Sequence, residues 1–351
     1  MSELLNNTPK KMNESIISGV SSDPSRLEFS LQSPALCLAW NEDSLVYGYN
    51  QGVTVLTRKP VVLGNAFASE WSFLSVEYHM GLACELIATC GAFVAVGHDD
   101  NTISLINTAE EDAIERTDVK RGHYDFVNGI DVNLDGMVAS VGDDRQLLIY
   151  SDKLEVVHKI KLDGAGRAVK FQEDGGPHLV VLEGSNRLNV YDWEKGQFLY
   201  TVFSNDVVGG SKKIGCCGPP AAVKAVALNV GQNHADQLTV LGSGWWRKYS
   251  SANLQGGGGH TVPNKQGELY GSRQLSGAVF CVSNDTAVVV SDKKTLFYSL
   301  GTEKSIEVAC DFVSGVEAAA VRAKGDLVAV AGGRALVLLN SAENESNIVR
   351  R

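Results

Sequence analysis

A histidine, a serine and an aspartate lie at a spacing that could support acid–base chemistry. His123 precedes Ser140 and Asp144, and a histidine bonded to a carboxylate can take the proton of a serine hydroxyl. That chemistry places the serine on a strained turn between a strand and a helix. Ser140 instead lies inside the run Met137–Val141, which is typical of a strand. We therefore predict no catalytic residue here, and we expect a structural role for the three side chains.

Two other patterns suggest metal or phosphate binding but lack the geometry for it. His98, Asp99 and Asp100 are consecutive, and successive side chains at a strand end point to alternate faces, so the three cannot reach one ion. The glycine-rich segments 164–167 and 256–259 do not follow a strand and open a helix, as a phosphate loop requires. The sequence therefore predicts no metal and no cofactor.

The composition is that of a soluble, folded and acidic protein. Hydrophobic residues make up 44% of the 351 residues, charged residues 21%, and the formal charge is −10. An acidic chain without a basic run repels a phosphate backbone, so we expect no direct nucleic-acid binding. The seven cysteines are scattered without a C-x-x-C pair, which favours buried thiols. No signal peptide or apolar span of membrane length is present, so we expect a protein of the cytosol or nucleus.

Short β-branched runs separated by Gly, Asp and Asn turns recur along the chain. The clearest unit has strands at 127–132, 137–141, 146–150 and 155–162, and the next has strands at 167–171, 178–182, 187–191 and 197–202. The ends of the third strands fall 41 to 58 residues apart, near the length of a WD-type repeat. These ends are Leu56, Ile106, Ile149, Tyr191, Tyr249, Tyr298 and Leu339. The prediction is an all-β fold, a seven-bladed WD40-type β-propeller.

The domain boundaries follow from this repeat. Residues 27–340 form the propeller, and the last unit lacks a fourth strand, so we expect Leu27–Ser30 to pair with it and close the ring. Residues 1–26 and 341–351 are predicted to be a flexible N-terminal tail and a polar C-terminal tail. Residues 251–271 are predicted to be a flexible insertion in blade five, and residues 205–220 an exposed connector.

Aromatic residues are the best candidates for contact with a partner. Trp245 and Trp246 stand beside Arg247 and Lys248, and aromatic side chains anchor many protein interfaces. The alternative is that one tryptophan packs between blades while the other covers the neighbouring turn. Expected loop positions add three more candidates: Tyr124, Phe126 and Asp143.

The segments 123–129 and 139–144 resemble the small WD-repeat nucleoporin of the Y-shaped nuclear pore complex. Val169, Leu179–Glu183, Leu188–Asp192 and Leu336–Leu339 are similar to the same family. WD-type blades use a set like His123, Ser140 and Asp144 as a hydrogen-bonded lock. Tyr150 departs from the family by replacing the usual tryptophan, and the N-terminal segment and the insertion 251–271 are further departures.

The resemblance implies a non-catalytic scaffold at the nuclear envelope, docked on the large propeller-plus-helix nucleoporin of the complex's long arm and supporting nucleocytoplasmic transport. The alternative is a WD-repeat adaptor in another assembly, such as a chromatin or ubiquitin-ligase complex, because a propeller fold does not fix its function. A propeller enzyme is a third class, but the seven histidines do not repeat from blade to blade. We predict a protein-binding subunit that neither enters the membrane nor binds nucleic acid.

Overall fold

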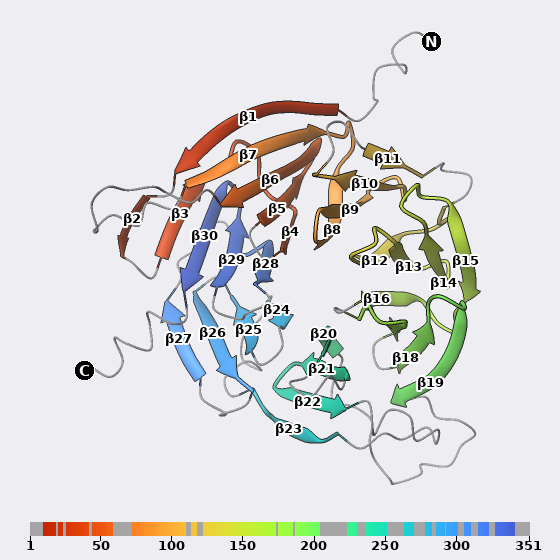
Figure 1. Cartoon of the computed structure of the whole chain (residues 1–351). Helices are drawn as coiled ribbons and strands as arrows, with labels where there is room; N and C mark the ends of the chain where they lie inside the picture. The colour runs from red at the N-terminus through yellow and green to blue at the C-terminus, as the bar shows by residue number, and fades with distance from the viewer. Residues whose placement is uncertain are drawn as a thin grey trace. The chain divides into compact units, whose positions relative to one another are not determined.

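The computed structural model shows an all-β chain. It describes residues 10–18, 20–23, 26–41, 44–58, 72–109, 114–117, 122–172, 175–184, 187–203, 223–230, 236–250, 263–269, 278–282, 286–291, 293–300, 305–309, 315–322 and 327–340. These residues form thirty strands in seven sheets and include no helix, so none that could cross a membrane is found among them. The fold class is the predicted seven-bladed β-propeller, and each sheet is one blade (Figure 1).

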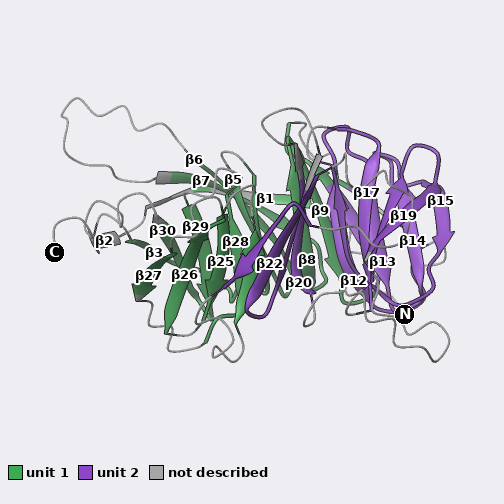
Figure 2. Ribbon diagram, turned by 90° about the horizontal axis from the view of Figure 1, so that it is seen from below, with its two compact units in different colours: residues 1–100, 106–114, 276–351 green, residues 101–105, 115–275 purple. Residues whose placement is uncertain are grey.

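The chain divides into two compact units (Figure 2). Unit 1 contains blades one, six and seven together with strands β8 and β9 of blade two, and unit 2 contains blades three, four and five. The remaining strands of blade two, β10 and β11, are divided between the units.

The blades of unit 2 each have four strands in chain order. Blade three consists of β12 (Val127–Val132), β13 (Val138–Gly142), β14 (Gln146–Tyr150) and β15 (Val156–Lys161). Blade four consists of β16 (Gly166–Phe171), β17 (His178–Glu183), β18 (Arg187–Asp192) and β19 (Gln197–Phe203). Blade five consists of β20 (Val223–Val230), β21 (Asp236–Gly242), β22 (Trp245–Ser250) and β23 (Lys265–Glu268).

Two sheets of unit 1 have a fifth strand. Blade one has the order β1 (Lys10–Ser18), β7 (Ser72–His79), β6 (Gly52–Arg58), β5 (Ser44–Tyr49), β4 (Cys37–Trp40). Blade seven has the order β2 (Val20–Asp23), β3 (Arg26–Ser30), β30 (Ala335–Asn340), β29 (Leu327–Gly332), β28 (Ala318–Val321). Blade six has β24 (Val279–Val282), β25 (Thr286–Val290), β26 (Lys294–Ser299) and β27 (Ser305–Ala309). Blade two has β8 (Cys84–Cys90), β9 (Phe93–His98), β10 (Ile103–Asn107) and β11 (Ile114–Arg116).

The middle strands carry the core. Every residue of β13, β14 and β29 is buried, because both faces of a blade are covered and the sequence of such strands is apolar without alternation. In unit 2, for example, Val141 and Ile149 of blade three pack with Val169 and Val181 of blade four. All seven residues that marked the repeat lie in the third strand of their blade, from Leu56 in β6 to Leu339 in β30.

The predicted pairing of Leu27–Ser30 with the last blade is present. β3 runs antiparallel to β30, with Leu27 opposite Leu338 and Phe29 opposite Leu336. The strand that the last repeat lacks is therefore supplied by the segment that precedes the first repeat.

Part of the expected flexible tail, residues 1–26, is instead strand. β1 pairs with β7, with Ser15 opposite Ser75 and Ser18 opposite Ser72, and β2 pairs with β3. The tail prediction is wrong here because it weighed polar side chains, whereas the backbone N–H and C=O groups make these bonds at an open sheet edge. Residues 1–9 lie outside the described residues.

The expected flexible insertion 251–271 also needs correction. Lys265–Glu268 form β23, the outer strand of blade five, with Trp245 of β22 opposite Glu268. The prediction was wrong for this segment because the nearby glycines and Pro263 indicated a flexible loop, and the strand is short and polar. The glycine run 256–259, the connector 205–220 and the C-terminal tail 341–351 lie outside the described residues.

Candidate interaction surface

The His123 network of blade three is present and closed. Nδ1 of His123 lies 2.8 Å from Oδ2 of Asp144, and Nε2 lies 2.7 Å from Oγ of Ser140. A neutral imidazole that donates from Nδ1 and accepts at Nε2 satisfies both neighbours. All three residues are buried, and their contacts connect the loop before β12 with β13 and with the turn that follows β13.

Burial sets the protonation of this network. It lowers the pKa of His123 below its usual value despite the opposing effect of the Asp144 charge, so the imidazole is neutral at neutral pH. Tyr150 is 1% exposed, and burial raises the pKa of its phenol to about 12. The only charge inside the set is the Asp144 carboxylate.

The same aspartate holds the loop that presents two aromatic side chains. The Tyr124 backbone N–H donates to Oδ2 of Asp144 at 3.3 Å, and the Tyr124 hydroxyl donates to the Asp144 carbonyl at 3.0 Å. The Asp143 N–H donates to the carbonyl of Phe126 at 2.9 Å. The residues Tyr124 and Phe126 are nevertheless 74% and 62% exposed. Hydrogen bonds to Asp143 and Asp144 therefore hold the loop in place, while its aromatic side chains face solvent.

Asp143 extends this surface toward blade four. Its Oδ1 accepts from Nδ2 of Asn128 at 2.9 Å and lies 3.0 Å from the guanidinium of Arg167. The Asn128 amide also donates to the carbonyl of Gly166 at 3.0 Å. Three of the predicted contact residues, Tyr124, Phe126 and Asp143, thus lie together on two linked loops.

Trp245 and Trp246 do not join them, which corrects the prediction of a contact surface there. Their exposed fractions are 4% and 3%. Trp245 packs over Gly242 on the paired strand, where an added Cβ would lie 2.1 Å from the ring, and Trp246 packs over Gly267, where that distance is 2.5 Å. The sequence pattern failed because it does not reveal that a glycine opposite each tryptophan makes room for the ring.

Sequence reasoning missed two apolar pairs on the outer strands. Val156 and Val157 of β15 are 38% and 48% exposed, and Phe198 and Leu199 of β19 are 53% and 39% exposed. In both strands the register shifts at this point, leaving Val157 or Leu199 as an extra residue. A bulge interrupts the alternation of side chains between the two faces of a strand. No turn residue in the sequence indicates its position.

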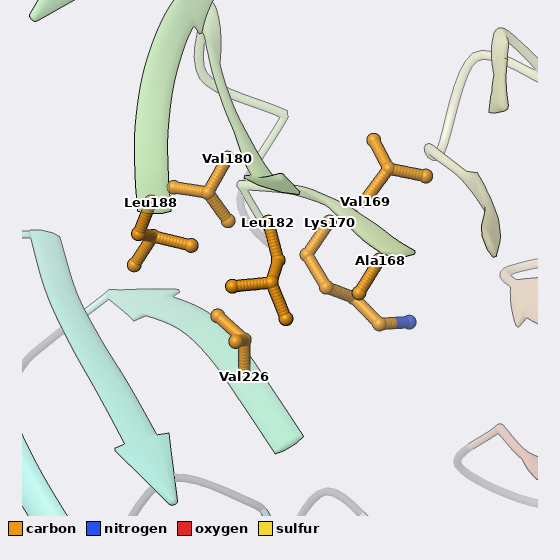
Figure 3. Close-up of a pocket in the computed structure, with 7 residues that line it drawn as sticks. All are labelled: Ala168, Val169, Lys170, Val180, Leu182, Leu188 and Val226. Atoms are coloured by element: carbon orange, nitrogen blue, oxygen red, sulfur yellow. The ribbon is translucent and has the colours of Figure 1, made fainter. Parts of the chain in front are cut away.

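The gap between blades four and five offers no binding cavity. Figure 3 shows the apolar side chains that meet there, and they leave no room for a water molecule. The lining residues are Ala168, Val169, Lys170, Val180, Leu182, Leu188 and Val226. The Lys170 ammonium turns away to Asp131 of blade three, at 2.7 Å. This contact surface is packing, not a ligand site.

Comparison with solved structures defines the class of the fold as a WD40 β-propeller. The chain is similar to the WD40 β-propeller domain of Doa1, with a TM-score of 0.59 and 10% identity over 89% of this chain and 95% of that one. No protein-family model matches the chain, and no curated protein sequence matches it. This likeness defines the fold and leaves the function open, because one fold can serve many functions.

Proposed function

We propose that this protein is a scaffold propeller of the Y-shaped nuclear pore complex, docked on the large propeller-plus-helix nucleoporin of its long arm. The observation that carries the proposal is the aromatic loop of blade three. It lies within the stretch 123–144 that resembles the small WD-repeat nucleoporin, and it exposes Tyr124 and Phe126 above a closed hydrogen-bond network.

The chemistry of this loop suits a protein partner. Exposed aromatic rings on a fixed backbone bury much apolar area at little cost in conformational entropy, and such residues dominate interface energies. The Asp143–Arg167 pair adds charge at the rim, where it favours the correct orientation of a partner more than it adds affinity. In this proposal the protein acts at the nuclear envelope by binding its partner. It catalyses no reaction.

Affinity purification of the tagged full-length chain from its own cells tests the proposal. We expect the long-arm nucleoporin as a stoichiometric partner and fluorescence at the nuclear rim. The double substitution Tyr124→Ala/Phe126→Ala should weaken the interaction by roughly 100-fold or more, since each interface anchor contributes about 2 kcal/mol. Leu134→Ala is the matched control, because Leu134 is 53% exposed and lies at the opposite end of β12.

A stable complex without a nuclear pore protein would favour the second candidate, an adaptor subunit of a chromatin or ubiquitin-ligase assembly. The same aromatic loop serves that function equally well, so partner identity separates the two. Retention of the partner by the double variant would show that a different surface binds.

A further inference from the structure

A polar cavity of about 200 Å³ lies within unit 1, between blades seven and one. Its floor is the buried set Leu31, Tyr47, Thr54 and Ser75, and Glu77 of β7 forms a wall. Three exposed side chains surround its mouth: Ser15, Ser30 and Gln32. The cavity is thus open to solvent and, apart from Leu31, lined by polar side chains.

The register of blade one explains why these residues meet. Tyr47, Thr54 and Glu77 are direct neighbours across β5, β6 and β7, so their side chains share one face of the sheet. Along the same face Leu45, Leu56 and Phe73 pack against blade seven in an apolar cluster. This face of the blade-one sheet therefore carries apolar side chains where it packs on blade seven. It carries hydroxyl and carboxylate groups where it lines the cavity.

Among the described lining residues, Glu77 is the one ionisable side chain besides Tyr47. Burial raises the pKa of the Tyr47 phenol, which remains neutral. Tyr49 donates a hydrogen bond to Oε1 of Glu77, and among the described residues it is the one hydrogen-bond donor that reaches this carboxylate. The other carboxylate oxygen is left for a ligand or water.

These groups select the chemistry of a ligand. A carboxylate repels anions, and an apolar ligand would remove its hydration without replacing it. An ammonium or guanidinium group supplies donors and no acceptor, which complements a carboxylate together with Ser, Thr and Tyr oxygens. The volume equals that of about seven waters at ~30 Å³ each, enough for such a head group and a short alkyl stem.

We propose that this cavity binds the terminal ammonium or guanidinium group of a basic ligand, with Glu77 as the counter-ion. Two sources share this chemistry: a free alkylamine, or the lysine or arginine side chain of another protein. The inference is independent of the proposed nuclear pore function, since it uses none of the residues of the blade-three loop.

Titration of the full-length protein, labelled with ¹³C in the tyrosine rings, with n-butylammonium chloride tests the proposal by NMR. We expect saturable shifts of the Tyr47 and Tyr49 ring signals, assigned with Tyr→Phe variants, and none with n-butanol as the neutral analogue. Blocked lysine and arginine, acetylated at the amino group and amidated at the carboxyl group, distinguish the sources. Binding of these compounds indicates a side-chain ligand, whereas binding of butylammonium alone indicates a free amine.

Glu77→Gln keeps the size of the side chain and should weaken binding at least tenfold, while Glu307→Gln on the outer strand β27 should leave it unchanged. Ser15→Trp blocks the mouth from an exposed position and should also abolish binding, which covers the case in which Glu77→Gln perturbs folding. The absence of saturable shifts at millimolar butylammonium, or equal binding by Glu77→Gln and the unchanged protein, would overturn the proposal.

Discussion

Two glutamate–tyrosine pairs, one in blade four and one in blade one, differ in how fully the carboxylate is bonded. Glu183 is 3% exposed and accepts hydrogen bonds from the backbone N–H groups of Asp163 and Gly164, both at 3.1 Å, from the Tyr191 hydroxyl at 3.3 Å, and from the Asn189 amide. Glu77 accepts from Tyr49 and faces a cavity. The comparison indicates that blade four uses its carboxylate to fix a loop, whereas blade one keeps its carboxylate accessible.

The largest expected effect is the loss of the closed site. Glu183→Ala leaves four donors without their acceptor, two of them backbone groups, and should lower the free energy of unfolding by roughly 3 kcal/mol. Glu77→Ala removes one hydrogen bond beside water and should cost less than about 1 kcal/mol. Urea denaturation of the two variants under one set of conditions measures the difference. Similar losses would show that the two carboxylates do not differ in structural role.

The His123 network is a second buried and fully bonded site, and acid should destabilise it. Because burial lowers the pKa of His123 in the folded protein, the unfolded chain binds the proton first as pH falls below about 6.5. The network therefore contributes its full stability above that pH and loses it on acidification.

His123→Ala should cost roughly 2 kcal/mol at pH 8, since Ser140 and Asp144 lose a buried partner. The gap between the unfolding midpoints of the two proteins should narrow as the pH is lowered toward 5. Midpoints that stay equally far apart across this range would show that His123 titrates as in the unfolded chain.

The smallest expected effect comes from adding one methyl group to each region. At Gly166 of blade four an added Cβ would lie 2.4 Å from Cβ of Val141, so Gly166→Ala should destabilise the protein by about 1–2 kcal/mol. Ser75→Thr places its methyl group beside the cavity of blade one and should cost less than about 0.5 kcal/mol. Thermal unfolding measures both, and a larger loss for Ser75→Thr would indicate that the blade-one cavity is filled.

The sequence predicted the fold well because the features that define a blade are local. Turn residues between β-branched runs located the strands of blades three and four, and the same spacing placed the third strands of all seven blades. The pairing of Leu27 with Leu338 could be predicted because the last repeat lacked its fourth strand. The segment before the first repeat was the unassigned stretch that could supply it.

The candidate sites were harder to predict because they depend on register. Whether Trp245 faces solvent or packs over Gly242 is decided by the opposite strand, and the cavity at Glu77 depends on Tyr47 and Thr54 from two other strands. The segment 164–167 binds an anion although its sequence does not predict this. It lacks the strand–helix setting of a phosphate loop, yet the Gly164 N–H binds an anion, the chain's own Glu183 carboxylate.

Blade seven contains two paired strands that lie far apart in the sequence. β3 is translated before residues 31–334, and its partner β30 is translated only after them. Until then β3 can pair only with β2, and its contact with β30 has to close a long loop, which slows the formation of such a contact. The sheet of blade seven can therefore be completed only after β30 has been translated, long after β3.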